Sequence, residues 1–323
     1  MTKSCVIIGL GQIGVGYDFD LSPALAVYTH ARAISLHSAF SLIGAVDPSS
    51  QYRSRFEQRY GAPTFITVES AMKQLSPDVV VIATPTKSHV SVLDQVLSSC
   101  RPKLILCEKP LAYSVDEGRA MVEMCKKEDV ELFVNYTRRS DHGVLEIKRR
   151  LDTGEIRTPV NVNAWYSKGI LNNGSHILNL LELWIGDILS VNVIHLGGLW
   201  DDHDPEPDAS IIFERGNAIV RATKEEYFSH FSVELLSPSG RLRYDKGGEL
   251  IEWQGVYEDP NFSGYRILAE QKETLQNGMK MYQLHVFDQI NQHFHGVETT
   301  LCTGRQALNT LEAINSIIIK RKL

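Results

Sequence analysis

The feature that most constrains the fold is an apolar run near the N-terminus that leads directly into a glycine motif. Residues 4–10 (SCVIIGL) are typical of a strand buried on both faces, and residues 9–14 (GLGQIG) form a G-x-G-x-x-G. In a dinucleotide site these glycines permit the strand-to-helix turn, the approach of a pyrophosphate, and close helix–strand packing. We therefore expect a following helix whose first N–H groups face phosphates. The predicted cofactor contacts here are Gly9, Gly11, Gln12, Ile13 and Gly14.

A second apolar segment, residues 40–47 (FSLIGAVD), ends in a carboxylate. An acid at the end of the second strand can bind the adenosine ribose hydroxyls and repel a 2′-phosphate, which favours NAD over NADP. Two alternatives stay open, because Asp47 followed by Pro48 is also a turn pattern and because Arg53 or Arg55 could accept a phosphate. We predict NAD as the cofactor, with NADP less favoured.

The pattern of segments predicts two domains. Strand-like and helix-like segments alternate through residues 1–135, which is typical of a doubly wound parallel sheet, an α/β Rossmann domain. Residues 136–303 are rich in β-branched segments separated by turns, so we predict an α+β domain with a large open, mainly antiparallel sheet. An amphipathic helix at 304–320 closes the chain.

One segment of the first domain is irregular. Asp47 lies much further beyond Gly14 than the usual spacing of about 20 residues. The excess is in Gly16–Pro23, which we interpret as a loop inserted before a helix at Ala24–His37. Such a loop either lies near the cofactor or is a surface excursion, and the sequence does not favour one of these.

Composition excludes several classes of protein. A chain of 323 residues with net charge −6 suits two globular domains and argues against a nucleic-acid-binding surface. The N-terminus does not have the pattern of a signal peptide, and no apolar run approaches the roughly 20 residues that a membrane span needs. Five cysteines without a C-x-x-C predict free thiols and a cytoplasmic protein. Residues 201–204 (DDHD), followed by two prolines, read as a solvated loop, and no metal site is predicted.

Candidate catalytic residues follow two of the predicted strands. Because ligands bind at the carboxyl edge of open α/β sheets, residues 84–89 (TPTKSH) and 108–110 (EKP) are placed near the cofactor. Lys109 could donate to a substrate hydroxyl and favour its alkoxide, or it could be a surface lysine paired with Glu108. The predicted cofactor contacts at this edge are Thr84, Pro85, His89, Glu108 and Lys109.

His176 is the second candidate catalytic residue. It follows a loop rich in glycine and asparagine at the start of a predicted helix, where an imidazole can point into a cleft. A neutral imidazole there is a suitable general base for a hydroxyl proton. The alternative is a capping or packed core histidine.

Together, the glycine motif, Asp47, T-P-T-x-x-H at 84–89, E-K-P at 108–110 and G-x-H at 174–176 resemble the Gfo/Idh/MocA family of glucose–fructose oxidoreductases and inositol dehydrogenases. The resemblance implies an NAD(P)-dependent oxidoreductase of sugars or cyclitols that forms a homodimer or homotetramer through its open sheet. It implies that Lys109 is the motif lysine and His176 the proton-transfer histidine. It also implies a cis bond before Pro110, and a helix at 304–320 that packs back on the first domain.

The sequence departs from the family at two positions. Asn172 and Asn179 stand where D-x-G-x-H-x-x-D has acids, and an amide cannot stabilise an imidazolium by charge. We therefore expect His176 to be neutral at pH 7. Residues 166–176 also resemble a branch associated with surface-polysaccharide and nucleotide-sugar genes. The predicted substrate contacts are Lys109, Tyr166, Asn172, Asn173, His176 and Asn179. For Tyr166 and for Lys168, which could supply the missing polar chemistry, the favoured alternative is an ordinary strand-edge residue.

The predicted function is hydride transfer between a nicotinamide and a hydroxyl-bearing carbon of a sugar, cyclitol or nucleotide sugar. The alternative is an NAD-binding regulatory or sensor protein of the same fold that has lost catalysis, which the two asparagines would suit. Lys109 and His176 favour the enzyme.

Overall fold

The computed structural model describes residues 2–321 and divides into two compact units. Unit 1 joins the chain up to Ser140 with Lys280–Leu311, and unit 2 joins Asp141–Met279 with the chain from Glu312 onward. Met1, at the start of the predicted first domain, lies outside the described residues. The predicted division at 135/136 placed residues 280–303 in the second domain, whereas the structure groups them with unit 1.

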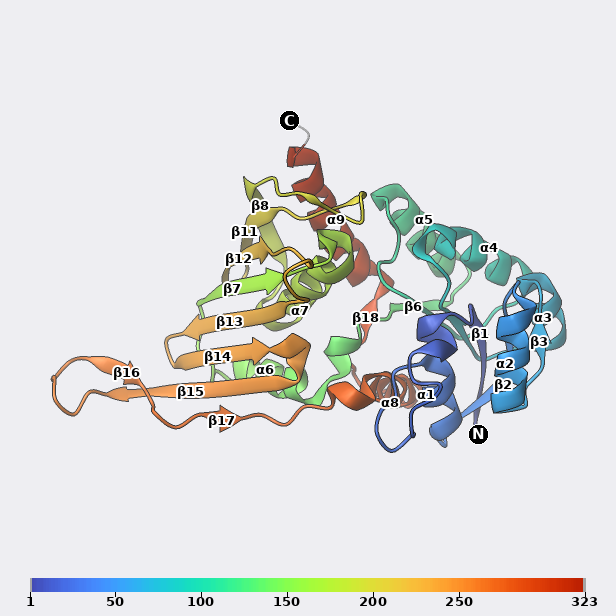
Figure 1. Cartoon of the computed structure of the whole chain (residues 1–323), viewed down its shortest axis with the longest axis horizontal. Coiled ribbons are helices and arrows are strands. Elements are labelled where there is room, and N and C mark those ends of the chain that lie inside the picture. Colours follow the sequence, from blue (N-terminus) through green and yellow to red (C-terminus); the bar gives the residue numbers. More distant parts are fainter. Residues whose placement is uncertain (1, 322–323) are drawn as a thin grey trace. The chain divides into compact units, whose positions relative to one another are not determined.

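Unit 1 contains a parallel sheet, as the alternating pattern predicts. In the described residues its order is β18-β6-β5-β4-β1-β2-β3, and each neighbouring pair is parallel except β18 with β6 (Figure 1). Because β1 lies between β4 and β2, the chain order reverses at its carboxyl end, where open α/β sheets bind ligands. The strands are β1 (Lys3–Ile8), β2 (Phe40–Val46), β3 (Thr64–Phe65), β4 (Val79–Ile82), β5 (Leu104–Cys107), β6 (Glu131–Val134) and β18 (Cys302–Thr303).

Four helices in the described part of unit 1, α1, α2, α3 and α5, begin at a short polar side chain that caps them. Thr29, Ser49 and Thr67 each accept a hydrogen bond from a first-turn N–H, and Ser114 forms a capping box with Glu117. The helices are α1 (His30–Leu36), α2 (Ser50–Tyr60), α3 (Val68–Gln74), α4 (His89–Ser99), α5 (Val115–Lys127), α8 (Tyr282–Phe294) and the first part of α9 (Gly304–Arg321), with short helical turns η1 (Gln12–Gly16), η2 (Thr86–Ser88), η3 (Thr137–Ser140) and, at the unit boundary, η6 (Met279–Met281).

The segment after the glycine motif differs from the prediction. The expected helix at 24–37 begins only at His30, and a single π-helical turn, η1, replaces the expected helix start. The cause is a buried anchor in the inserted loop: the Asp18 carboxylate accepts hydrogen bonds from Tyr28 N (2.6 Å), Thr29 N (3.0 Å) and Thr29 Oγ1 (2.7 Å). Arg32 Nε lies 3.5 Å from the same carboxylate, and both side chains are buried. The loop is therefore fixed from within rather than loosely attached.

Unit 2 is built on a large, mainly antiparallel sheet, as predicted. Its order in the described residues is β16-β15-β14-β13-β7-β12-β11-β8, with β17 on β15, and only the β7–β12 pair is parallel (Figure 1). The strands are β7 (Val160–Tyr166), β8 (Ile188–His195), β11 (Asp208–Phe213), β12 (Gly216–Ala222), β13 (Phe231–Ser237), β14 (Gly240–Asp245), β15 (Leu250–Glu258), β16 (Arg266–Leu268) and β17 (Glu273–Thr274), with a separate hairpin of β9 (Leu199–Trp200) and β10 (Asp204–Pro205).

One face of this sheet carries the core of unit 2. Along β7 the inward residues are Val160, Val162, Ala164 and Tyr166, and they alternate with exposed residues as period-2 burial requires. The inward face packs with α6 (His142–Asp152), α7 (Ser175–Ile185) and the second part of α9. Two short turns, η4 (Gly169–Gly174) and η5 (Lys246–Gly248), complete the unit.

Helix α9 contributes to both units. In unit 1, Leu308 and Leu311 lie against Gly118 of α5, so that an added methyl there would meet them at 3.3 and 3.1 Å. In unit 2, Ile314 and Ile317 belong to the core beneath the sheet. The predicted packing of the 304–320 helix on the first domain stays a prediction; in the structure its residues up to Leu311 group with unit 1 and those from Glu312 group with unit 2.

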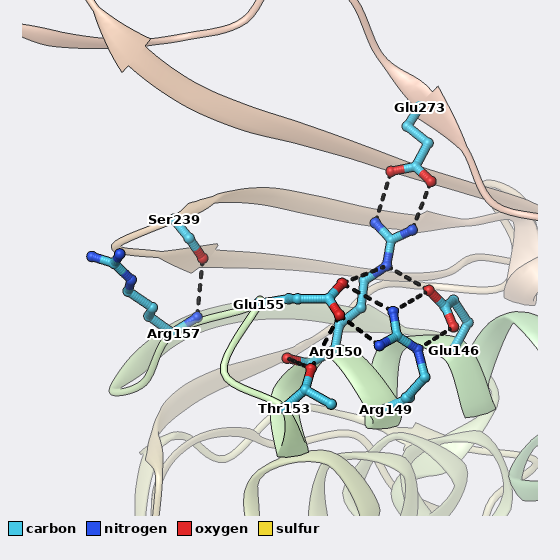
Figure 2. Close-up of polar contacts among 8 residues, drawn as sticks. All are labelled: Glu146, Arg149, Arg150, Thr153, Glu155, Arg157, Ser239 and Glu273. Atoms are coloured by element: carbon cyan, nitrogen blue, oxygen red, sulfur yellow. Dashed lines mark hydrogen bonds and ion pairs between the residues drawn. The ribbon is translucent and has the colours of Figure 1, made fainter.

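An ion cluster ties β17 to α6 in unit 2. Arg150 forms a bidentate pair with Glu273 at 2.6 and 2.7 Å, and Arg149 pairs with both Glu146 and Glu155 (Figure 2). Hydrogen bonds from Arg149 and Arg150 lower the pKa of Glu146 to about 2. Such exposed networks mainly orient the elements that they join.

Further features of the described residues concern their cysteines, their longest helices and their acidic and histidine side chains. All five cysteines are free, and four of them are buried. Among residues 2–321, no helix combines the length and apolar character that crossing a membrane requires. The same residues contain no group of histidine, cysteine and acidic side chains arranged to hold a metal ion.

Candidate functional site

The glycine motif forms a close-packed turn at the carboxyl end of β1. Gly9 has φ +99°, and a methyl on it would lie 2.6 Å from Ala83 O, whereas one on Gly14 would lie 2.2 Å from Gly9 O. Neither contact is tolerable for a side chain, so both glycines are required by packing of the chain itself. A methyl on Gly11 would meet nothing within 4 Å. The open space beside Gly11 is the part of the turn that a ligand can approach.

Asp47 lies at the end of β2, next to this turn, and is buried. Its Oδ2 accepts a hydrogen bond from Leu10 N and its Oδ1 accepts one from Ser49 N, both at 2.8 Å. These bonds fix the carboxylate against the glycine turn. Each oxygen keeps a further lone pair with which to accept from a ligand hydroxyl.

The two arginines considered as phosphate ligands have protein partners. Arg53 donates to the carbonyl oxygens of Asp47 and Pro48 at 2.8 and 3.0 Å. Arg55 lies over the ring of Phe19 at 3.7 Å and 3.8 Å from the carboxylate of Asp20, both in the inserted loop. Arg53 therefore lies beside Asp47, whereas Arg55 is held by the inserted loop.

The ends of β4 and β5 carry the other predicted cofactor contacts. The Thr84 hydroxyl oxygen is buried and has no hydrogen-bond partner among the described residues. Pro85, which follows it, is exposed. His89 is fully buried, with its ring nitrogens 3.1 Å from Leu111 O and 3.0 Å from Thr84 O. His89 thus holds the shape of this edge, and its direct contact with a cofactor stays a prediction.

Glu108 belongs to a buried ring of four side chains in unit 1. Its Oε1 lies 2.9 Å from His30 Nε2 and accepts from Asn135 Nδ2 at 2.6 Å. Gln283 of α8 closes the ring, because its Oε1 accepts from Asn135 Nδ2 at 3.1 Å and its Nε2 lies 2.9 Å from His30 Nδ1. The next peptide bond, Lys109–Pro110, is cis, as the family resemblance implies.

The ring sets the ionisation of Glu108. Burial, the largest influence, raises the pKa of Glu108, but hydrogen bonds from His30 and Asn135 and the nearby Lys109 charge outweigh it and hold the pKa below its usual value. None of His30, Asn135 and Gln283 belongs to a recognisable sequence motif. They are far apart in the chain, so no local pattern could have linked them.

In unit 2, His176 is buried as the second residue of α7. The predicted loop before it is the π-helical turn η4, which contains Asn172 and Asn173 and continues directly into α7. Asn172 and Asn173 are half-buried, and Asn179 is buried one turn beyond His176. The structure therefore places the predicted substrate contacts on one continuous helical segment of unit 2.

The carboxylate of Asp204 binds the backbone of the η4 turn. The interpretation of residues 201–204 as a solvated loop is therefore wrong for Asp204. Asp201–His203 are exposed, but Asp204 is buried and accepts hydrogen bonds from Leu171 N and Asn172 N at 2.9 Å each. Gly169 makes room for it, since an added methyl would lie 2.1 Å from the carboxyl carbon. Burial raises the pKa of Asp204 to about 6 against the lowering effect of these backbone bonds.

We expect stability to depend on pH through Asp204. The folded pKa, about 6, exceeds the ordinary value of 3.8, so the folded state binds the proton more tightly and loses stability as pH rises through this window. The shift corresponds to about 3 kcal/mol between pH 4 and 7. In urea unfolding, the free energy of unfolding of the parent minus that of Asp204→Asn should fall by this amount between pH 4 and pH 7. Curves that stay parallel would contradict it.

Tyr166 has a packing role in the structure. Its side chain is fully buried beneath the sheet, and its hydroxyl donates to Pro207 O at 2.8 Å. Burial, together with the nearby Asp204, Glu206 and Asp208, raises the pKa of Tyr166 well above its usual value. A contact between Tyr166 and substrate stays a prediction.

The fold and the glycine turn of unit 1 define a dinucleotide-binding protein of the Rossmann class. Residues 3–136 match the family model described as "Oxidoreductase family, NAD-binding Rossmann fold", GFO_IDH_MocA. This match covers fewer than half of the residues of the chain, and through it the first domain is similar to the Gfo/Idh/MocA oxidoreductases, the family that the sequence motifs resemble. The predicted cofactor, NAD, is that of the family description.

Individual relatives share parts of the chain. Scyllo-inositol 2-dehydrogenase (NAD(+)) of Bacillus subtilis is 27% identical over 158 residues, covering 48% of this chain and 42% of that protein. Inositol 2-dehydrogenase of Rubrobacter xylanophilus is 28% identical over 239 residues, covering 69% and 65%. The chain thus spans less than half of the Bacillus relative.

Solved structures match over the whole fold. The WlbA dehydrogenase of Bordetella pertussis, solved with NADH and UDP-GlcNAcA, superposes with a TM-score of 0.76 at 20% identity, covering 100% of this chain and 97% of that one. At this identity the match establishes the fold shared by the two proteins.

Proposed function

We propose that the protein is an NAD-dependent oxidoreductase that transfers a hydride between the nicotinamide and a hydroxyl-bearing carbon of a sugar, cyclitol or nucleotide sugar. The observation that carries this proposal is the turn in which Gly9 and Gly14 are closed by the chain while Gly11 opens to a ligand beside the buried Asp47. The names of the inositol dehydrogenases and of the WlbA dehydrogenase support the substrate class.

The residues of unit 1 fit a dinucleotide. The space at Gly11 suits a pyrophosphate, and the free lone pairs of Asp47 suit ribose hydroxyls. The unsatisfied Thr84 hydroxyl at the end of β4 suits a polar group of the ligand. The residues that would hold the cofactor are Gly9, Gly11, Gln12, Ile13, Gly14, Asp47, Thr84, Pro85 and Lys109, with His89 and Glu108 shaping the edge.

The bound nicotinamide supplies hydride chemistry, and the chain supplies charge and proton transfer. Lys109 donates a hydrogen bond to the reacting oxygen and stabilises the negative charge that develops there. His176 accepts the hydroxyl proton. Asn172, Asn173 and Asn179 orient hydroxyl groups of the substrate through neutral hydrogen bonds.

The outer surface of unit 2 suits assembly into a homodimer or homotetramer through the open sheet. Trp165, Ile212 and Leu236 point outward from three strands of the sheet and are exposed. We also propose a cytoplasmic location, in keeping with the free cysteines. Size-exclusion chromatography with light scattering measures the assembly.

The function is tested by following NADH formation or consumption with a panel of sugars, cyclitols and nucleotide sugars. Turnover of at least one of these compounds is expected. Absence of turnover throughout the panel, together with tight NADH binding, would overturn the enzymatic function.

We expect NADH to bind more tightly than NADPH because the Asp47 carboxylate attracts ribose hydroxyls and repels a 2′-phosphate. In calorimetry, Asp47→Asn should weaken NADH binding roughly tenfold and narrow the gap to NADPH. Asparagine keeps the shape and an acceptor for Leu10 N, but its amide N–H group would face Ser49 N, so thermal unfolding of the variant is measured beside its affinity. Equal or tighter NADPH binding by the parent would contradict the prediction and point to Arg53.

A further inference from the structure

The four-residue ring at Glu108 has one consistent arrangement of hydrogen atoms. An ionised carboxylate can only accept, so Asn135 Nδ2 and His30 Nε2 must both donate to Glu108. The second N–H of Asn135 donates to Gln283 Oε1, which fixes the orientation of the glutamine amide. Gln283 Nε2 then donates to His30 Nδ1, which must be unprotonated. The ring therefore selects neutral His30 with its proton on Nε2.

No alternative arrangement satisfies every member of the ring. A proton on His30 Nδ1 would face the Gln283 amide N–H, and turning that amide would set its N–H groups against those of Asn135. An unpaired buried donor is destabilising, so each member of the ring constrains the others. His30, Asn135 and Gln283 are all buried; His30 lies on α1, Asn135 directly follows β6, and Gln283 lies on α8.

We propose that His30 and Gln283 are positioning residues, which hold the Glu108 carboxylate as a fixed anion and so set the place of Lys109. The inference rests on the proposed function, because Lys109 is the residue that acts on the substrate. Lys109 N lies 3.3 Å from Glu108 Oε2, so the carboxylate anchors the backbone of the lysine directly. Val27 lies between the inserted loop and His30; its N–H donates to Lys280 O of η6 at 2.8 Å, and its carbonyl oxygen accepts from Gln283 N of α8 at 3.3 Å, so the segment before His30 contacts the start of α8.

The ring also fixes the orientation of a hydrogen-bond acceptor, the Oδ1 atom of Asn135. Because both N–H groups of Asn135 are used within the ring, its Oδ1 is turned away from the ring. This buried oxygen has no partner among the residues that the structure describes. An unsatisfied acceptor held in one orientation beside Glu108 can receive a hydrogen bond from a bound ligand or a buried water.

Four titratable groups face Glu108, namely His30 of α1, Cys107 and Lys109 on its own strand and loop, and Tyr282 of α8. The hydrogen bonds of the ring offset the burial that would otherwise raise the pKa of Glu108. If His30 no longer donates, less opposes the effect of burial, so the pKa of Glu108 rises and the carboxylate takes up a proton at higher pH. As the pH is lowered, activity that needs the ionised carboxylate is then lost at a higher pH than in the parent.

The test compares ring variants with a matched buried glutamine on the same helix. Gln283→Leu and His30→Leu should lower kcat by roughly tenfold or more, because small displacements of a catalytic group are costly. His30→Gln retains a donor at the position of Nε2 and should stay near the parent value. Gln289→Leu removes hydrogen bonds to Arg139 O and Thr300 outside the ring, and should lower thermal stability without changing kcat.

The pH–rate profile separates positioning from mere stability. In His30→Leu the acidic limb should move to higher pH, and in Gln289→Leu it should not move. Ring variants that lose only thermal stability, with kcat and the acidic limb unchanged, would overturn the proposal. If Gln283→Leu does not fold, His30→Leu and His30→Gln carry the comparison.

A second measurement does not depend on turnover. NMR of protein with ¹⁵N-labelled histidine rings, assigned by the loss of a signal in His30→Gln, should show His30 neutral with its proton on Nε2. A protonated ring, or a proton on Nδ1, would overturn the ring. If the parent turns over no substrate, the proposed function fails, and this spectrum with the NADH affinity of the ring variants still decides the positioning role. Unchanged NADH affinity in those variants would then reject it.

Discussion

Gly11→Ala should weaken NADH binding by about 100-fold or more while leaving the stability of the protein nearly unchanged. A methyl at this position meets no atom of the chain within 4 Å, and its φ of −71° suits alanine. The methyl would stand in the space through which a pyrophosphate approaches the backbone. Calorimetry with NADH and thermal unfolding of the same variant measure the two effects separately.

Gly14→Ala provides the contrast. Its methyl would lie 2.2 Å from Gly9 O, a backbone atom that cannot move aside cheaply, so this variant should lose about 3 kcal/mol or more of stability. Gly255→Ala is the control, because a methyl on β15 of unit 2 also meets nothing within 4 Å and lies far along the chain from the motif. Undiminished NADH binding by Gly11→Ala would show that no pyrophosphate approaches this turn.

Much of the fold follows from local pattern. Helices α2 and α5 and strand β7 follow from the sequence because their periodicity, caps and turns all lie within a few residues. The glycine motif and Asp47 can also be recognised from the sequence, since each directly follows the apolar run of a strand. Such elements need no information from distant parts of the chain.

The rest depends on contacts that sequence distance conceals. The sequence predicts a loop after the glycine motif, but it does not show that Asp18 is buried there. Because Asp18 accepts hydrogen bonds from Thr29, the helix begins at His30 rather than at the predicted position. Asp204 was interpreted as solvated from its charged and proline-rich neighbours, although it caps η4 from 32 and 33 positions away. His30 and Gln283 are 253 positions apart, and neither stands in a recognisable motif. In each case a buried polar group finds its partner only in the folded chain.

The largest effect on catalysis is expected from Lys109→Met. Lys109 follows β5 at the ligand-binding edge of the sheet and is anchored through Glu108, so it is the cation proposed to stabilise the developing alkoxide. Losing one fixed charge of this kind typically lowers kcat by about 10²–10³. Asn172→Ala removes a neutral hydrogen bond and should lower kcat by about tenfold or less. Steady-state kinetics with the best substrate of the panel measure both.

Lys87→Met is the matched control for this comparison, because Lys87 is an exposed lysine in the turn that follows β4 of the same sheet. It should keep the kcat of the parent, since its ammonium group is not proposed to meet the reacting oxygen. NADH affinity, measured for each variant, separates a loss of cofactor binding from a loss of catalysis.

His176→Ala should lower activity most under conditions in which proton transfer limits the rate. Asn172→Asp should move the acidic limb of the pH–rate profile to higher pH, because a carboxylate stabilises the imidazolium. Full activity in both Lys109→Met and His176→Ala would overturn the assignment, because no other proposed residue supplies either the charge or the base.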